Sequence, residues 1–207
     1  MILNQLLSNY VFAVIRGKNE EDAIEITKNC ILGGIKNIEI TFSTPNAAKV
    51  IETVVKMYEN DSTVVIGAGT VMTLSQADEA INSGSKFLVS PHFSKDIMNY
   101  SLDKNVLYFP GCGTVTEIVD AMEMGAKIIK VFPGGTLGSG FIKAVHGPLP
   151  EAKLMPSGGV SLENVRNWKA SGACAVGLGS DLTKGVIDND YSSVKIYAEN
   201  FIELVKD

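Results

Sequence analysis

The stretch GAKIIKVFPGG, residues 125–135, combines a glycine typical of a helix end, an apolar run and a Pro-Gly-Gly turn. Its apolar residues alternate little with polar ones, as in a parallel strand that is covered on both faces. Lys130 is the exception, because it lies inside the apolar run and close before the turn. The stretch therefore predicts a buried strand with an ionisable side chain near its carboxyl end.

Similar apolar runs recur along the chain and alternate with longer segments of helical periodicity. The predicted strands are residues 10–15, 37–41, 63–67, 86–90, 106–109, 126–130, 152–157 and 173–177. Capping patterns at Thr44-Pro45, Thr73 and Thr114 predict helix starts, and glycines such as Gly125 predict helix ends. About eight strand–helix units in a short chain favour a closed barrel over an open sheet. We therefore expect an α/β fold, a single-domain (β/α)8 TIM barrel that spans residues 1–207.

The composition limits the class of protein. Hydrophobic residues make up 45% of the chain and charged residues 20%, and the formal net charge is -5, which provides no basic face for nucleic acid. No apolar run approaches the roughly 20 residues of a membrane span, and the amino-terminal segment lacks the pattern of a signal peptide. The cysteines and histidines are scattered and form no metal-binding motif. We expect a cytoplasmic protein without metal, nucleic-acid or membrane partners.

In such a barrel, functional groups gather where strands end and the following loops begin. Lys130 has this position, and partly apolar surroundings disfavour the charged form of an amine, which leaves a nucleophile that can attack a carbonyl carbon. Glu39 lies between two isoleucines near the end of another predicted strand and could accept and return a proton beside it. Alternatively, Lys130 points outward to solvent or pairs with an acid as a structural buried ion, and Glu39 forms a plain ion pair with Lys130 or Arg16.

A third feature is Ser157-Gly158-Gly159, which follows the seventh predicted strand. A Gly-Gly turn before a helix capped by Ser161 would offer backbone N–H groups to an anion. Gly179 and Ser180 follow the eighth predicted strand, and barrels often bind phosphate at these two places. The alternative is a simple tight turn.

Taken together, these segments resemble the aldolases of 2-keto-3-deoxy-6-phosphogluconate (KDPG) and 4-hydroxy-2-oxoglutarate (KHG). The resemblance covers nearly the whole chain and includes, in order, VIRG, GGIKNIEITFSTPNA, IGAGTV, FLVSPHF, PGCGTVTE, GAKIIKVFPGG and PSGGV. It implies a class I aldolase of carbohydrate metabolism, such as the Entner–Doudoroff pathway, that needs no cofactor and assembles as a homotrimer. The implied substrate is a 2-keto-3-deoxy sugar acid phosphate that yields pyruvate.

The resemblance also implies a role for individual residues. Lys130 would form the Schiff base, and Glu39 would transfer protons. Arg16, Thr70 and Pro91 would line the pocket for the pyruvate half, with Phe132 beside the lysine. The distal phosphate would be held by Ser157, Gly158, Gly159, Gly179 and Ser180.

The chain departs from the family pattern at Ser43, where many members carry an arginine. One cationic contact to substrate is then missing, and Arg16 has to supply the charge alone. The preference among KDPG, its galactonate epimer and KHG is therefore open. A sugar-phosphate isomerase or epimerase, or a sugar-phosphate-binding barrel without catalysis, remains the alternative function.

Overall fold

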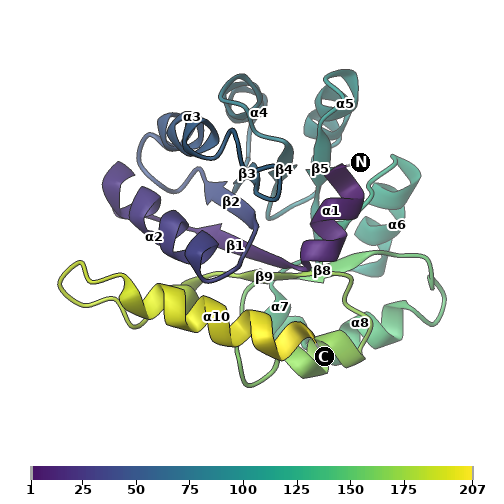
Figure 1. The fold of residues 1–207 in the computed structure, drawn as a ribbon. Coiled ribbons are helices and arrows are strands. Elements are labelled where there is room, and N and C mark those ends of the chain that lie inside the picture. Colours follow the sequence, from purple (N-terminus) through teal and green to yellow (C-terminus); the bar gives the residue numbers. More distant parts are fainter. Residues whose placement is uncertain (1, 207) are drawn as a thin grey trace.

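Parallel strands curl into a barrel with helices around it in the computed structural model, which describes residues 2–206 (Figure 1). The strands are β1 (Val11–Ile15), β2 (Asn37–Thr41), β3 (Val65–Gly69), β4 (Phe87–Val89), β5 (Leu107–Phe109), β6 (Gly111–Cys112), β7 (Ile129–Val131), β8 (Leu154–Pro156) and β9 (Val176–Leu178). The helices are α1 (Ile2–Asn9), α2 (Glu20–Leu32), α3 (Ala47–Met57), α4 (Leu74–Asn82), α5 (Lys95–Asp103), α6 (Val115–Glu123), α7 (Gly134–Leu137), α8 (Ser139–Val145), α9 (Val165–Ala170), α10 (Ser192–Lys206) and the 3-10 helix η1 (Ser180–Leu182).

Two sheets of parallel strands make up the barrel wall. One has the order β5-β4-β3-β2-β1-β9 and the other the order β6-β7-β8. Strands β5 and β6 are successive parts of one barrel strand, interrupted at Pro110, whose carbonyl still accepts from the Lys130 N–H at 2.9 Å. Pairing of Ser157 with Gly177 joins β8 to β9 and closes the circle. The predicted TIM barrel is confirmed.

Several predicted element boundaries shift in the structure. The third strand covers residues 65–69 instead of 63–67, and the last covers 176–178 instead of 173–177. The helix predicted to start at Thr44-Pro45 begins at Ala47, because the Thr44 hydroxyl accepts from the Gly17 N–H instead of capping the helix. Caps at Thr73 and Thr114 are confirmed.

The amino-terminal end of the barrel interior is apolar. Phe12, Phe87 and Phe109 meet there, with ring centroids 5.4 to 6.1 Å apart. Helix α1, drawn in dark purple in Figure 1, covers this end with Leu6, whose carbonyl accepts a hydrogen bond from the Asn37 side chain at 2.9 Å. The sequence reasoning did not predict this helix. Within residues 2–206, every helix is too short or too polar to cross a bilayer.

Candidate active site

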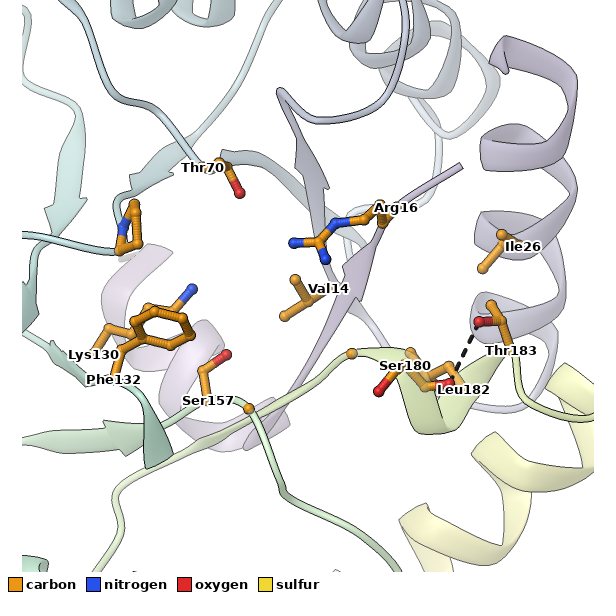
Figure 2. Close-up of a pocket in the computed structure, with 13 residues that line it drawn as sticks. Val14, Arg16, Ile26, Thr70, Lys130, Phe132, Ser157, Ser180, Leu182 and Thr183 are labelled. Carbon is orange, nitrogen blue, oxygen red and sulfur yellow. Dashed lines mark hydrogen bonds between the residues drawn. The ribbon is translucent and has the colours of Figure 1, made fainter. Parts of the chain in front are cut away.

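A cavity of about 480 Å³ opens at the carboxyl ends of the strands (Figure 2). It is lined by Val14, Arg16, Ile26, Thr70, Pro91, Lys130, Phe132, Ser157, Gly158, Gly179, Ser180, Leu182 and Thr183. Most of the residues predicted for the site therefore meet in one place. The sequence reasoning missed the wall formed by Val14, Ile26, Leu182 and Thr183, because only the barrel closure and the position of α2 bring these residues together.

Lys130 lies in β7 at the wall of this cavity. The residue is only 5% exposed, so the alternative in which it points outward to solvent is wrong. Its Nζ lies 5.4 Å from the centroid of the Phe132 ring and 3.7 Å from Oε1 of Glu39. The amine is therefore enclosed, faces a carboxyl group, and still borders the space in which a substrate would lie.

Glu39 is completely buried in β2, behind the amine of Lys130. Burial raises the pKa of Glu39 above its usual range, and the charges of Lys130 and Arg16 offset this effect only in part. Neither carboxyl oxygen has a hydrogen-bond partner among residues 2–206, and 3.7 Å to Nζ is too long for one. A buried ion pair stabilises a fold only where good geometry and further hydrogen bonds compensate for desolvation. A purely structural ion pair therefore explains this arrangement poorly.

Gly69 provides the space that Glu39 occupies. A Cβ atom at position 69 would overlap the carboxyl group of Glu39. The third strand was predicted to end at Gly67, whereas β3 continues to Gly69, so both glycines lie within the strand. A glycine inside an apolar strand often marks the close approach of another group. Gly69 was therefore the sequence signal for the space that Glu39 occupies.

Arg16 follows β1, and its guanidinium points into the cavity in Figure 2. Its Nε donates to the Ser43 hydroxyl at 2.9 Å, and Ser43 contacts the Thr41 hydroxyl at 2.8 Å. Thr41 in turn donates to the carbonyl of Ile15 at 2.9 Å. The Ser43 hydroxyl thus orients the guanidinium of Arg16.

Thr70 and Pro91 line the cavity after β3 and β4. Thr70 has a φ of 53°, a left-handed conformation that is uncommon for a β-branched residue. Such a residue persists only where its surroundings impose the conformation, and such residues cluster at functional sites.

Ser157, Gly158, Gly179 and Ser180 line another part of the cavity. Gly158 and Gly159 have φ angles of 81° and 79°, which favour glycine. Gly159 is not among the lining residues and packs against Gly135 instead, where an added Cβ would come within 2.7 Å of the Gly135 Cα. The helix predicted to be capped by Ser161 begins only at Val165, after a turn in which Asn164 caps the Ser161 N–H. Any anion would therefore meet loop N–H groups here and not the end of a long helix.

Among the described residues, no three His, Cys, Asp or Glu side chains come together in a way that could hold a metal ion.

Comparison with known proteins agrees with this geometry. The family model for "KDPG and KHG aldolase" matches residues 2–196. The chain belongs to the KDPG and KHG aldolase family. It is 31% identical over 198 residues to the 2-dehydro-3-deoxy-phosphogluconate aldolase of Treponema pallidum (strain Nichols), covering 94% of this chain and 93% of that protein.

The similar proteins are not all named for the same sugar acid. The chain is 32% identical to the 2-dehydro-3-deoxy-6-phosphogalactonate aldolase of Escherichia coli (strain K12), with 83% of each chain covered. A KDPG aldolase from Legionella pneumophila is similar with a TM-score of 0.83 and 26% identity, covering 99% of this chain and 96% of that one. That structure contains pyruvate captured as a covalent carbinolamine. The protein is accordingly a class I aldolase, a lyase.

Proposed function

We propose that this aldolase cleaves KDPG to pyruvate and glyceraldehyde 3-phosphate, and that it also cleaves KHG to pyruvate and glyoxylate. The observation that carries the proposal is the buried Lys130–Glu39 pair, in which the amine borders the cavity and both carboxyl oxygens lack hydrogen bonds within residues 2–206. A carboxyl group with a raised pKa is suited to accept and return a proton near neutral pH.

In the proposed mechanism, neutral Lys130 attacks the C2 ketone, and loss of water gives a protonated imine that accepts electrons from the bond to be broken. Glu39, directly or through a water molecule, removes the proton of the C4 hydroxyl. The C3–C4 bond breaks, which leaves an aldehyde and an enamine on Lys130. Glu39 then returns the proton to C3, and hydrolysis of the imine releases pyruvate and restores the free amine.

The other cavity residues have proposed roles in holding substrate. Arg16, whose orientation Ser43 fixes, would bind the carboxylate of the pyruvate half together with Thr70 and Pro91, and Phe132 would cover the reacting carbon. Figure 2 places Lys130 and Ser180 in different parts of the cavity, with Ser157 between them. This arrangement supports phosphate binding near Ser157, Gly158, Gly179 and Ser180, with Gly159 shaping the turn.

Borohydride trapping tests the nucleophile. The protein is incubated with pyruvate, reduced, and analysed by intact mass and peptide mapping. We expect one reduced adduct, on Lys130, that is absent from a Lys130→Met variant and present in Lys127→Met, which alters an exposed lysine three residues earlier. A folded protein without an adduct would refute the mechanism.

Substrate preference is tested by coupling pyruvate release to lactate dehydrogenase. KDPG, its galactonate epimer and KHG are compared by kcat/KM, and we expect KDPG to be cleaved best. Relatives at similar identity are named for both sugar acids, so a higher value for the galactonate epimer would correct the substrate and leave the mechanism intact.

We further propose that the enzyme is a single-domain cytoplasmic homotrimer that takes part in the Entner–Doudoroff pathway. The cysteines Cys30, Cys112 and Cys174 are free thiols, as suits a reducing compartment. Met72, Leu74 and Val115 are 45 to 47% exposed at the starts of α4 and α6, and they offer apolar surface for subunit contact. Light scattering after size exclusion would give three times 22.1 kDa for a trimer.

A further inference from the structure

Tyr197 of α10 links the two loops that border the proposed phosphate end of the cavity. Its hydroxyl oxygen accepts a hydrogen bond from the Leu162 N–H at 3.3 Å, in the segment that follows Gly158 and Gly159. The same hydroxyl donates to Oδ2 of Asp181 at 2.9 Å, in η1 after β9. One side chain thus fixes the distance between two loops that come from different strands.

The Tyr197 ring is itself held in place. It stacks on the fully buried Phe201 with centroids 6.3 Å apart and an angle of 29° between the planes. Nζ of Lys184 lies 5.4 Å from the ring centroid and 3.3 Å from Oδ2 of Asp181. Burial, together with the bond to Asp181, raises the pKa of Tyr197, so the hydroxyl keeps its proton at neutral pH.

Both linked loops contribute to the cavity, whereas Tyr197 does not line it. Gly158 belongs to one loop, and Ser180 and Leu182, the two neighbours of Asp181, belong to the other. Thr183 also lines the cavity, and its hydroxyl donates to the Ser180 carbonyl at 3.4 Å (Figure 2). A shift of Asp181 would therefore move the residues that face the ligand.

We propose that Tyr197 is a positioning residue for the distal phosphate of the substrate, and that it acts through Asp181 and Leu162. This inference rests on the proposed function and specifies how the phosphate end of that site is held. Loops fixed before binding lose less conformational freedom when the ligand arrives, which increases affinity without altering the reacting centre. Loss of such an interaction raises KM and leaves kcat unchanged.

The test is Tyr197→Phe, which removes only the hydroxyl. We expect KM for KDPG to rise about three- to tenfold, the range for one lost hydrogen bond, with kcat unchanged. KM for KHG, which has no phosphate, should stay the same, as should the rate of pyruvate trapping on Lys130. Tyr100→Phe is the matched control, since it removes a similar bond, from Tyr100 of α5 to the exposed Asp78 of α4, and should change none of these values.

A second pair of variants tests the other end of the link. Asp181→Asn keeps an oxygen that can accept from Tyr197, whereas Asp181→Leu does not, so we expect a smaller rise in KM for Asn than for Leu. An equal rise for KDPG and KHG, a fall in kcat, or no change in any variant would overturn the proposal. If Tyr197→Phe does not fold, the two Asp181 variants still test whether the bond between Tyr197 and Asp181 supports phosphate binding.

Calorimetric binding of glycerol 3-phosphate separates this inference from the proposed function, because it needs no turnover. If pyruvate fails to form an adduct but glycerol 3-phosphate binds about three- to tenfold more weakly to Tyr197→Phe than to the unaltered protein, the mechanism fails and the positioning role stands. If the adduct forms and the two proteins bind the probe equally, or neither binds it, the positioning role fails.

Discussion

Gly67 and Gly69 lie two positions apart in β3, and each makes room for a neighbouring side chain inside the barrel. A Cβ at Gly67 would come within 2.6 Å of the Phe87 ring, and one at Gly69 would overlap the carboxyl group of Glu39. The first glycine accommodates an aromatic ring in the lower interior, which is the apolar amino-terminal end of the barrel around Phe87. The second accommodates a buried acid in the upper interior, which is the carboxyl-terminal end around Glu39 and Lys130. A missing Cβ therefore makes room for an apolar ring in one region and for an ionisable carboxyl group in the other.

The lower interior consists of apolar contacts. Phe12 meets Phe87 edge to face, and Phe87 stacks on Phe109 with centroids 5.6 Å apart. Both arrangements are favourable for aromatic rings, and burial removes their apolar surface from water. The upper interior holds Glu39 and Lys130, whose desolvation is only partly compensated. We infer that the lower interior supplies stability, whereas the upper interior holds groups whose arrangement suits catalysis.

The largest expected effect comes from Glu39→Gln, which changes the upper interior with almost no change in volume. We expect kcat/KM for KDPG to fall about 10²- to 10⁴-fold, the usual contribution of a general acid or base. The thermal midpoint should not fall, because the amide avoids the cost of a buried charge. The coupled lactate dehydrogenase assay and circular dichroism measure the two quantities. A fall in rate of less than tenfold would assign proton transfer to another group.

Phe87→Ala, in the lower interior, should lower stability and leave the reactivity of the folded protein unchanged. Removing a buried aromatic ring leaves a cavity and typically lowers the free energy of unfolding by about 3–5 kcal/mol. Chemical denaturation measures this loss, and trapping at saturating pyruvate gives the fraction of folded protein that still reacts. We expect that fraction to match the unaltered protein. Leu102→Ala, at a 54% exposed position, is the control and should change stability little.

The two regions also differ in how far the sequence predicted them. Lys130 and Glu39 were predicted because a charged side chain within an apolar strand is a local signal, and the end of a strand gives its place on the barrel. The space at Gly67 and Gly69 depends on strands that are distant in sequence, as does the bond from Ser43 to Arg16. Helix α1 was missed because its role depends on the closed barrel that it covers.

Gly69→Ala and Gly67→Ala compare the two regions by adding a single methyl group to each. Each added methyl group overfills a packed interior, which typically costs about 1–3 kcal/mol of stability. Gly69→Ala should also reduce KDPG cleavage, because it displaces Glu39, whereas Gly67→Ala should leave the activity of the folded protein unchanged.

A double-mutant cycle identifies the cause of the Gly69→Ala effect. Glu39→Ala removes the carboxyl group that the new methyl would meet, so Gly69→Ala should cost less stability in that background. Denaturant unfolding of the four proteins gives the interaction energy. Equal costs in both backgrounds would mean that Glu39 is not the group displaced.

The smallest expected effect is a difference in the pH dependence of stability between the unaltered protein and the variant Glu39→Gln. The pKa of Glu39 is raised above its ordinary 4.5, chiefly by burial, so above pH 4.5 the unfolded chain releases this proton more readily than the folded one. The unaltered protein should therefore lose stability relative to the variant as pH rises from 4.5 towards the raised pKa, by at most about 1.4 kcal/mol per pH unit. Urea unfolding of both proteins across this range measures the difference, in which the other titrating groups cancel. A difference of the opposite sign would show that the attraction of Lys130 outweighs burial, and the pair would then stabilise the upper interior just as the aromatic rings stabilise the lower one.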